Sequence, residues 1–123
     1  MSKAGDDECR LAILVRSDLK MGKGKIAAQA GHAAVCCAMA CVKKKPDLMK
    51  EWIGGGQPKI VLRVESESEL YEFKAVADAQ GIINSVITDA GRTQIEPGTV
   101  TCIGIGPERK SVLDKITGEL RML

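Results

Sequence analysis

The chain has 123 residues, which is the length of one domain that can bury a core without disulfides or metals. Its composition is 45% hydrophobic and 28% charged, as in a globular protein, and its 2% aromatic content predicts a core of aliphatic and small residues. The net charge of +2 excludes nucleic-acid binding through bulk charge, so such a role must rest on local clusters of cations. The few aromatic residues also disfavour base stacking, which leaves recognition of phosphate and shape.

Residues 1–8 are polar and are expected to form a flexible tail in front of one domain over 9–123. Neither a signal peptide nor a membrane anchor is recognised. The cysteines are odd in number and contain no C-x-x-C pair, a pattern that favours reduced thiols in the cytoplasm.

Hydrophobic periodicity and turn residues predict eight elements. In chain order they are a strand over 11–15, a helix over 25–42, a helix over 46–52, a strand over 59–64, a helix between a capping box at 66–69 and Gly81, a strand over 82–88, a strand over 99–105, and a helix from 106–107 to about 115. This order indicates a small mixed sheet with helices on its faces, the α/β class.

The sequence predicts which residues form the buried face of two of the helices. Small apolar residues recur at helical spacing in the long helix and are expected to pack on the sheet: Ile26, Ala30, Ala33, Cys37 and Cys41. The buried face of the third helix is expected to consist of Leu70, Phe73, Val76 and Ala77.

The first functional cluster is the junction between the first strand and the long helix, residues 16–29, which carries four cations and two glycines. Glycines let a ligand approach the backbone, and the N–H groups and dipole at a helix start favour anions. Lys20, Lys23 and Lys25 add full positive charges, so the junction is predicted to bind anions.

The second cluster is the polar loop after the third strand, where Asp89, Arg92, Thr93 and Thr99 precede Thr101 in the next strand. If this loop lies beside the junction, a carboxylate, an ammonium and a hydroxyl converge, a set suited to hydrolysis of an activated ester. The alternative of equal weight is a plain salt bridge that pins the loop to the helix, and Asp89 also fits the role of a turn residue.

Other chemistries are disfavoured. The single histidine, His32, shares a helix stripe with Lys25, Gln29 and Cys36, which offers two metal ligands at most, so no metal is expected. The cysteines lack a basic partner other than His32, which disfavours a thiol nucleophile. The glycines and lysines of the junction have the wrong spacing for a P-loop or a dinucleotide fingerprint. The lysines at 43–45 are interpreted as a solvated helix end.

Five segments together resemble the type-two peptidyl-tRNA hydrolases of archaea and eukaryotes, and the resemblance extends from about Leu11 to the end of the chain. They are VRSDLKMGKGKIAAQ at 15–29, HAA at 32–34, GQPK at 56–59, DAGRTQ at 89–94 and GIGP at 104–107.

This resemblance implies a cofactor-free enzyme that cleaves the ester between a peptide and its tRNA, in a compact α/β domain with a four-stranded mixed sheet, commonly a homodimer in the cytoplasm that supports ribosome recycling. It implies catalytic roles for Lys25 as charge stabiliser, Asp89 as the group that orients or activates water, Thr93 as the residue that aligns the reacting groups, and Thr101. The residues expected to bind substrate, from the junction and the resemblance, are Lys20, Lys23, Gln29, His32, Arg92 and Gln94. The alternative is a non-catalytic module that binds RNA backbone or protein through the same cations.

Overall fold

The computed structural model describes residues 7–90 and 98–123. The elements are β1 (Cys9–Arg16), α1 (Lys23–Lys44), α2 (Pro46–Gly54), β2 (Lys59–Val64), α3 (Glu67–Ala79), β3 (Asn84–Thr88), β4 (Val100–Arg109) and α4 (Lys110–Thr117). The predicted order and the α/β class are confirmed.

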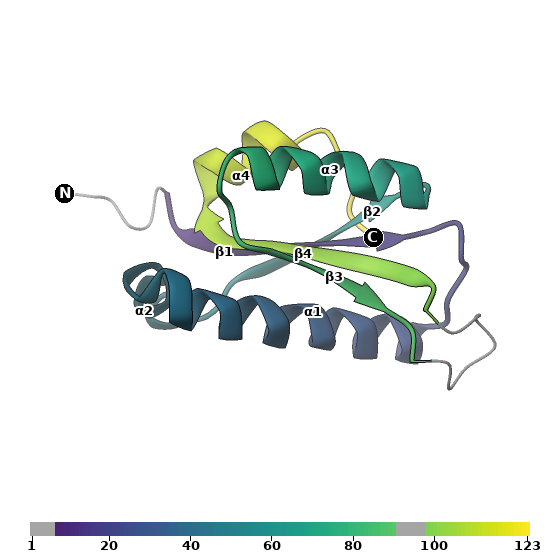
Figure 1. Cartoon of the computed structure of the whole chain (residues 1–123), viewed down its shortest axis with the longest axis horizontal. Helices are drawn as coiled ribbons and strands as arrows, with labels where there is room; N and C mark the ends of the chain where they lie inside the picture. The colour runs from purple at the N-terminus through teal and green to yellow at the C-terminus, as the bar shows by residue number, and fades with distance from the viewer. Residues whose placement is uncertain (1–6, 91–97) are drawn as a thin grey trace.

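The four strands form one mixed sheet in the order β2-β1-β4-β3. The central strand β1 pairs parallel with β2 and antiparallel with β4, and β3 pairs antiparallel with the other side of β4. The last residues of the chain cover the outer edge of β2, because Arg63 donates its backbone N–H to Arg121 and Leu123 donates to Val61. β3 forms the opposite edge of the sheet (Figure 1).

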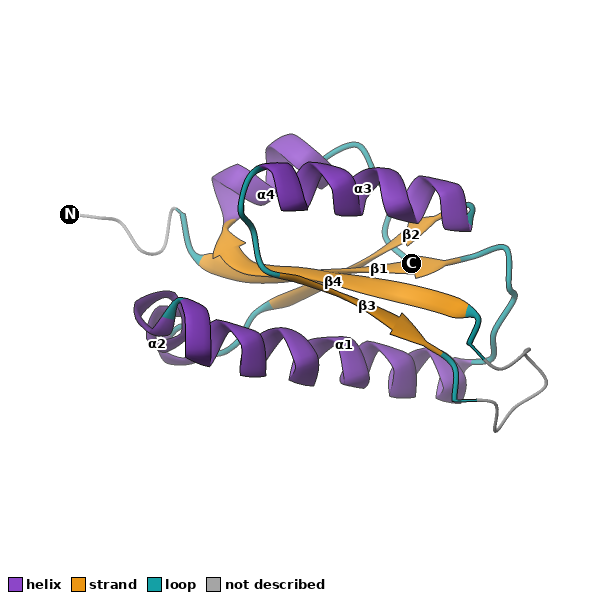
Figure 2. Cartoon of the chain, in the orientation of Figure 1, coloured by secondary structure: helices purple, strands orange, loops and turns teal. Residues whose placement is uncertain are grey.

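Helices cover both faces of the sheet, with α1 and α2 on one face and α3 and α4 on the other (Figure 2). This arrangement explains the unbroken apolar sequence of β1, because side chains of a strand alternate between the two faces. Leu11, Ile13 and Val15 belong to the core under α1 and α2, whereas Ala12 and Leu14 belong to the core under α3 and α4.

The small side chains of α1 let it lie close to β4. Ala33, Cys37 and Cys41 are buried, as predicted. The contact is tightest at Gly104, where an added Cβ would lie 2.7 Å from the Cys37 sulfur and 3.3 Å from the Ala33 Cβ. A glycine is therefore required where the helix crosses the strand, and this crossing fixes the start of α1 relative to the ends of β3 and β4.

The predicted end of the last strand was wrong. β4 continues through Gly106 and Pro107 to Arg109, and the last helix begins only at Lys110. Glu108 and Arg109 pair with the first residues of β1. A register shift between Arg10 and Ala12 accommodates the proline, because proline has no N–H to donate to the neighbouring strand.

One predicted core residue was also wrong, since Val76 is 40% exposed. It lies about 120° around the helix from the buried Leu70, at 100° per residue, and so falls at the margin of the apolar face.

Among the described residues, α1 is the one helix that is long and apolar enough to cross a membrane by length and composition. Its buried side packs on the sheet, as in the core helix of a folded domain, so length and composition carry little weight here. The prediction of a flexible tail over 1–8 stays a prediction; within it, Asp7 accepts hydrogen bonds from the backbone N–H and the hydroxyl of Ser111.

Candidate functional site

The predicted anion-binding junction forms the start of α1. Gly22 is the N-cap residue and offers no side-chain cap, and the first turn contains no acidic residue. The helix start therefore keeps its positive end without an internal counter-charge, with Lys23 and Lys25 in the first turn. From this turn the Lys25 ammonium reaches across to the carboxylate of Asp89, with which it forms an ion pair.

Asp89 is held where the two adjacent strands β3 and β4 diverge. Its N–H donates to the carbonyl of Thr99 (2.8 Å), and its carbonyl accepts from the N–H of Gly98 (2.9 Å). The Asp89 side chain is 1% exposed and that of Lys25 is 18% exposed. A carboxylate this well enclosed requires a partner, which Lys25 provides. Folding thus joins the two clusters that the sequence predicted, and the pair fits both the catalytic interpretation and that of a structural salt bridge.

A second pair stands next to this one in the core. The Gln29 side chain is buried and donates a hydrogen bond of 2.6 Å to the hydroxyl of Thr101, which in turn donates to the carbonyl of Ile87 (3.3 Å). Thr101 is fully buried. It contacts Gln29 but is not among the described residues that line the neighbouring cavity.

Lys25, Gln29 and Asp89 border a cavity of about 550 Å³ between α1 and the end of β3. Its described lining consists of Lys25, Ala28, Gln29, His32, Thr88, Asp89 and Ala90. His32 is exposed at this cavity, one helical turn beyond Gln29. The cavity is charged where Lys25 and Asp89 meet, and its remaining described lining combines polar side chains with two alanines, so it can receive a charged group at one end.

The other predicted site residues have different positions. Lys20 and Lys23 are exposed outside this lining, and Lys20 has a left-handed backbone with a φ of 53°. Arg92, Thr93 and Gln94 lie outside the described residues.

The fourth cation of the junction has a structural role that sequence reasoning missed. Arg16 binds both carboxylate oxygens of Asp18 (2.7 and 3.1 Å) and donates to the carbonyl of Val100 (2.9 Å). The hydrogen bonds from Arg16 hold the pKa of Asp18 below its ordinary value. The R-S-D sequence offered a signal, since an arginine and an aspartate two positions apart at a strand end can pair.

Four of the five cysteines are shielded from solvent. All five are free thiols, and only Cys36 is exposed. Burial raises the pKa of Cys37 to about 12 and that of Cys102 to about 11, so both stay neutral at physiological pH. No cluster of three His, Cys, Asp or Glu side chains that could hold a metal ion occurs within residues 7–90 and 98–123.

The fold and the cavity define a small α/β domain with a lysine–carboxylate pair at the carboxyl end of an edge strand, beside a cationic helix start. The family of peptidyl-tRNA hydrolase PTH2 matches residues 9–123, and the chain belongs to this family. It is 54% identical to a peptidyl-tRNA hydrolase of Thermoplasma volcanium and 52% identical to one of Thermoplasma acidophilum, in each case over 93% of this chain and 97% of the relative. It is 45% identical to a peptidyl-tRNA hydrolase of Methanocaldococcus jannaschii, over 93% of this chain and 99% of the relative.

Proposed function

We propose that the protein hydrolyses the ester bond between the peptide and the tRNA of peptidyl-tRNA, and that the reaction takes place at Lys25 and Asp89. Membership of the family supports the reaction. The observation that carries the choice of site is the enclosed ion pair, because its two residues come from distant parts of the chain and meet on the wall of one cavity. Enclosed charge pairs at cavities are frequent at reaction centres.

In the proposed reaction Asp89 accepts a proton from a water molecule, whose oxygen attacks the ester carbonyl carbon. The Lys25 ammonium stabilises the negative charge that develops on the carbonyl oxygen. The bond between that carbon and the ribose oxygen breaks, the proton passes to the ribose oxygen, and free tRNA and peptide leave. The scheme uses water as its only co-reactant and requires no cofactor.

The remaining residues have supporting roles in this proposal. Gln29 borders the reacting groups and Thr101 fixes its orientation, so Thr101 is a positioning residue. Thr93 aligns the reacting groups, and the substrate contacts are made by Lys20, Lys23, His32, Arg92 and Gln94. The exposed cations at the start of α1 suit the RNA backbone near the ester.

The test is release of free tRNA from N-acetyl-aminoacyl-tRNA by the purified chain. We expect multiple turnovers, and a loss of at least about 100-fold in kcat for Lys25→Ala, with partial recovery on addition of a small alkylamine. Because removing one partner of an enclosed pair lowers stability by about 3–5 kcal/mol, the assay is run well below the melting temperature of the variant. tRNA binding without cleavage by the unmodified chain would instead support the binding module.

We further propose that the chain forms a homodimer through the outer face of α1. Val35, Met39 and Val42 are 58%, 63% and 54% exposed on this face, and the helix carries no Lys, Arg, Asp or Glu between Lys25 and Lys43. An uncharged apolar face of this length suits the same face of a second copy. A stable interface covers about 800 Å² per partner, so it must extend beyond these three side chains over neighbouring exposed residues of α1.

Light scattering tests this dimer. We expect twice the chain mass for the unmodified protein and the mass of one chain for Met39→Lys. A monomer at a concentration of tens of micromolar would overturn this part of the proposal. A cytoplasmic location and a supporting role in ribosome recycling stay predictions from the resemblance.

A further inference from the structure

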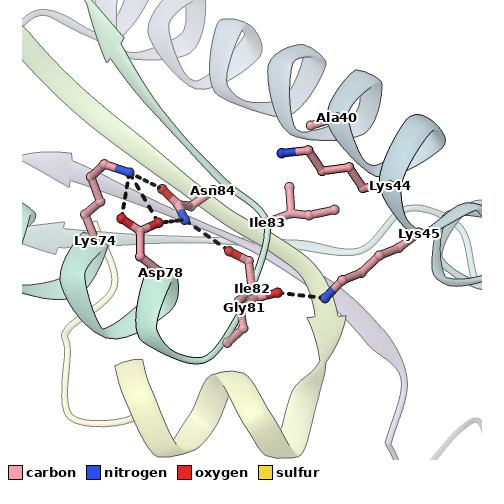
Figure 3. A pocket seen from close by; sticks show the side chains of 9 residues that line it. All are labelled: Ala40, Lys44, Lys45, Lys74, Asp78, Gly81, Ile82, Ile83 and Asn84. Carbon is pink, nitrogen blue, oxygen red and sulfur yellow. Dashed lines mark hydrogen bonds and ion pairs between the residues drawn. The ribbon is translucent and has the colours of Figure 1, made fainter.

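A second pocket lies at the end of α1, whereas the candidate active site lies at its start (Figure 3). It has a volume of about 370 Å³. Its lining comes from the end of α1, the end of α3 and the segment that enters β3, and consists of Ala40, Lys44, Lys45, Lys74, Asp78, Gly81, Ile82, Ile83 and Asn84. Three ammonium groups therefore surround a concave site that contains one carboxylate.

The single carboxylate is already engaged. Lys74 lies 3.1 Å from an Asp78 oxygen and donates to the side-chain oxygen of Asn84 (3.0 Å), while the Asn84 amide donates to Asp78 (2.8 Å). The hydrogen bonds from Asn84 and Lys74 hold the pKa of Asp78 below its ordinary value, so this carboxyl group is ionised at neutral pH. The network fixes Lys74 at the rim of the pocket and neutralises only one of the three ammonium groups.

Lys44 and Lys45 differ from Lys74 in their contacts. The Lys45 ammonium donates to the carbonyl of Gly81 (2.8 Å), which positions it without neutralising it. Within the described part of the chain no carboxylate lies within ion-pair distance of Lys44 or Lys45. Figure 3 shows the Lys45 side chain extending from the end of α1 to Gly81, whereas the Lys44 side chain runs alongside α1 near Ala40 in this view.

Lysines at a helix end also compensate the negative end of the helix dipole. That role accounts for two of the three, but not for Lys74, which comes from a helix on the opposite face of the sheet. Compensation of the helix dipole also does not explain why the surface at these lysines forms a pocket. Lysines from two helices that border one open pocket are better suited to a chain of several phosphate groups than to a single small anion.

The position of this pocket relative to the candidate active site indicates which class of ligand it binds. α1 contributes Lys25 to one pocket and Lys44 to the other, about 28 Å apart at 1.5 Å of helix rise per residue, and both pockets border β3. Figure 1 shows α1 running along this edge of the sheet. A tRNA substrate is a long polyanion that extends far beyond its ester, so phosphates at this distance from the reacting bond are available.

We propose that Lys44, Lys45 and Lys74 form a phosphate subsite that holds the tRNA backbone while the ester occupies the cavity at Lys25 and Asp89. This inference rests on the proposed function. Phosphate contacts fix register and orientation without reading sequence, which suits an enzyme whose substrates differ in both tRNA and peptide. The subsite therefore contributes to KM and not to kcat.

The test compares the double variant Lys44→Ala/Lys45→Ala with the unmodified chain. We expect KM for N-acetyl-aminoacyl-tRNA to rise about 5–10-fold at low salt, with kcat unchanged. The slope of log affinity for deacylated tRNA against log salt concentration decreases by about one for each phosphate that the variant no longer binds. If the double variant does not fold, Lys44→Gln alone retains the hydrogen bond of Lys45 and is expected to show half of the change in slope.

Lys115→Gln is the matched control for Lys44→Gln, and the double variant is compared with it per lysine removed. Lys115 is an exposed lysine in the last turn of α4, on the other face of the sheet, so its removal changes the same kind of charge at the same kind of helix end. Equal salt slopes and equal KM values for the control and the test variant would overturn the subsite. Absence of hydrolysis by the unmodified chain would contradict the proposed function instead, and the salt slope for deacylated tRNA would still decide on the subsite.

Discussion

The side-chain amide of Gln29 lies 2.6 Å from the hydroxyl of Thr101, so a residue on the wall of the candidate active site is held by a fully buried residue of the central strand β4. The Thr101 hydroxyl donates to the carbonyl of Ile87, which leaves its lone pairs to accept from Gln29. The orientation of the amide is therefore set inside the core.

Replacing Thr101 by valine tests this relationship. Valine has the same shape but leaves the buried Gln29 amide with only its longer hydrogen bond to the Thr88 carbonyl (3.5 Å), so we expect the free energy of unfolding to fall by about 1–3 kcal/mol. Thr101→Ser retains the hydroxyl and is expected to recover kcat, whereas Thr101→Val lowers it at a temperature where both are folded. Urea denaturation and turnover measure the two effects. Equal kcat for serine and valine would show that Gln29 needs no positioning by Thr101.

Gly104→Ala probes the contact between α1 and β4. The added methyl would lie 2.7 Å from the Cys37 sulfur, so the helix must shift away from the sheet. We expect a decrease of about 1–3 kcal/mol in the free energy of unfolding. The double variant Gly104→Ala/Cys37→Ala removes the closest clashing atom and is expected to be destabilised less than Gly104→Ala alone. Chemical denaturation measures all three proteins, and an unchanged midpoint for Gly104→Ala would contradict the close contact.

Two substitutions of Lys20 distinguish its effect on stability from its effect on substrate binding, because this residue has a left-handed backbone. A non-glycine residue in this region costs about 1–2 kcal/mol, so we expect Lys20→Gly to unfold at a higher temperature than Lys20→Ala. Both variants lack the same cation and are expected to raise KM for the tRNA substrate by the same several-fold factor. Thermal unfolding and steady-state kinetics check this pair. Unchanged KM values would remove Lys20 from the substrate-binding residues.

The thiols are expected to react selectively. Cys9, Cys37 and Cys102 are buried, and burial raises the pKa of each to about 11, 12 and 11, so their reactive thiolate forms occur only in strongly alkaline solution. Cys41 is also buried, which leaves Cys36 as the one exposed thiol of the five. At pH 8 a brief treatment with iodoacetamide is expected to add one label to the native chain and five to the chain in urea. Mass spectrometry counts the labels, and Cys36→Ser should abolish labelling of the native form.

The sequence predicted the fold well wherever one local signal was unopposed. The apolar run of β1, the alanine-rich α1 and the strand over 59–64 are all observed. The prediction was wrong at Gly106 and Pro107, where a turn signal was overridden by pairing between Cys9 and Arg109 at the far end of β1. No local pattern reveals that the first strand needs a partner at that point.

The candidate site shows the same limit. Two clusters of residues, at the junction and after the third strand, predicted that Lys25 and Asp89 meet. The sequence does not reveal the position of β4. Two features depend on this position, namely the burial of Thr101 and the hydrogen bonds that Arg16 donates to Asp18 and to the Val100 carbonyl. The pocket at Lys44 and Lys74 was also missed, because its lysines come from helices on opposite faces of the sheet.

The most direct test of the proposed active site is the single-turnover rate of N-acetyl-aminoacyl-tRNA cleavage by Asp89→Asn, with Asp47→Asn on the exposed side of α2 as the matched control. Removal of the carboxylate eliminates the proton acceptor while keeping its shape, so we expect a rate at least about 100-fold lower and affinity for deacylated tRNA unchanged or tighter. The control is expected to cleave at the rate of the unmodified chain. An Asp89→Asn rate within about threefold of the control, with the fold intact, would contradict the assignment of catalysis to Lys25 and Asp89.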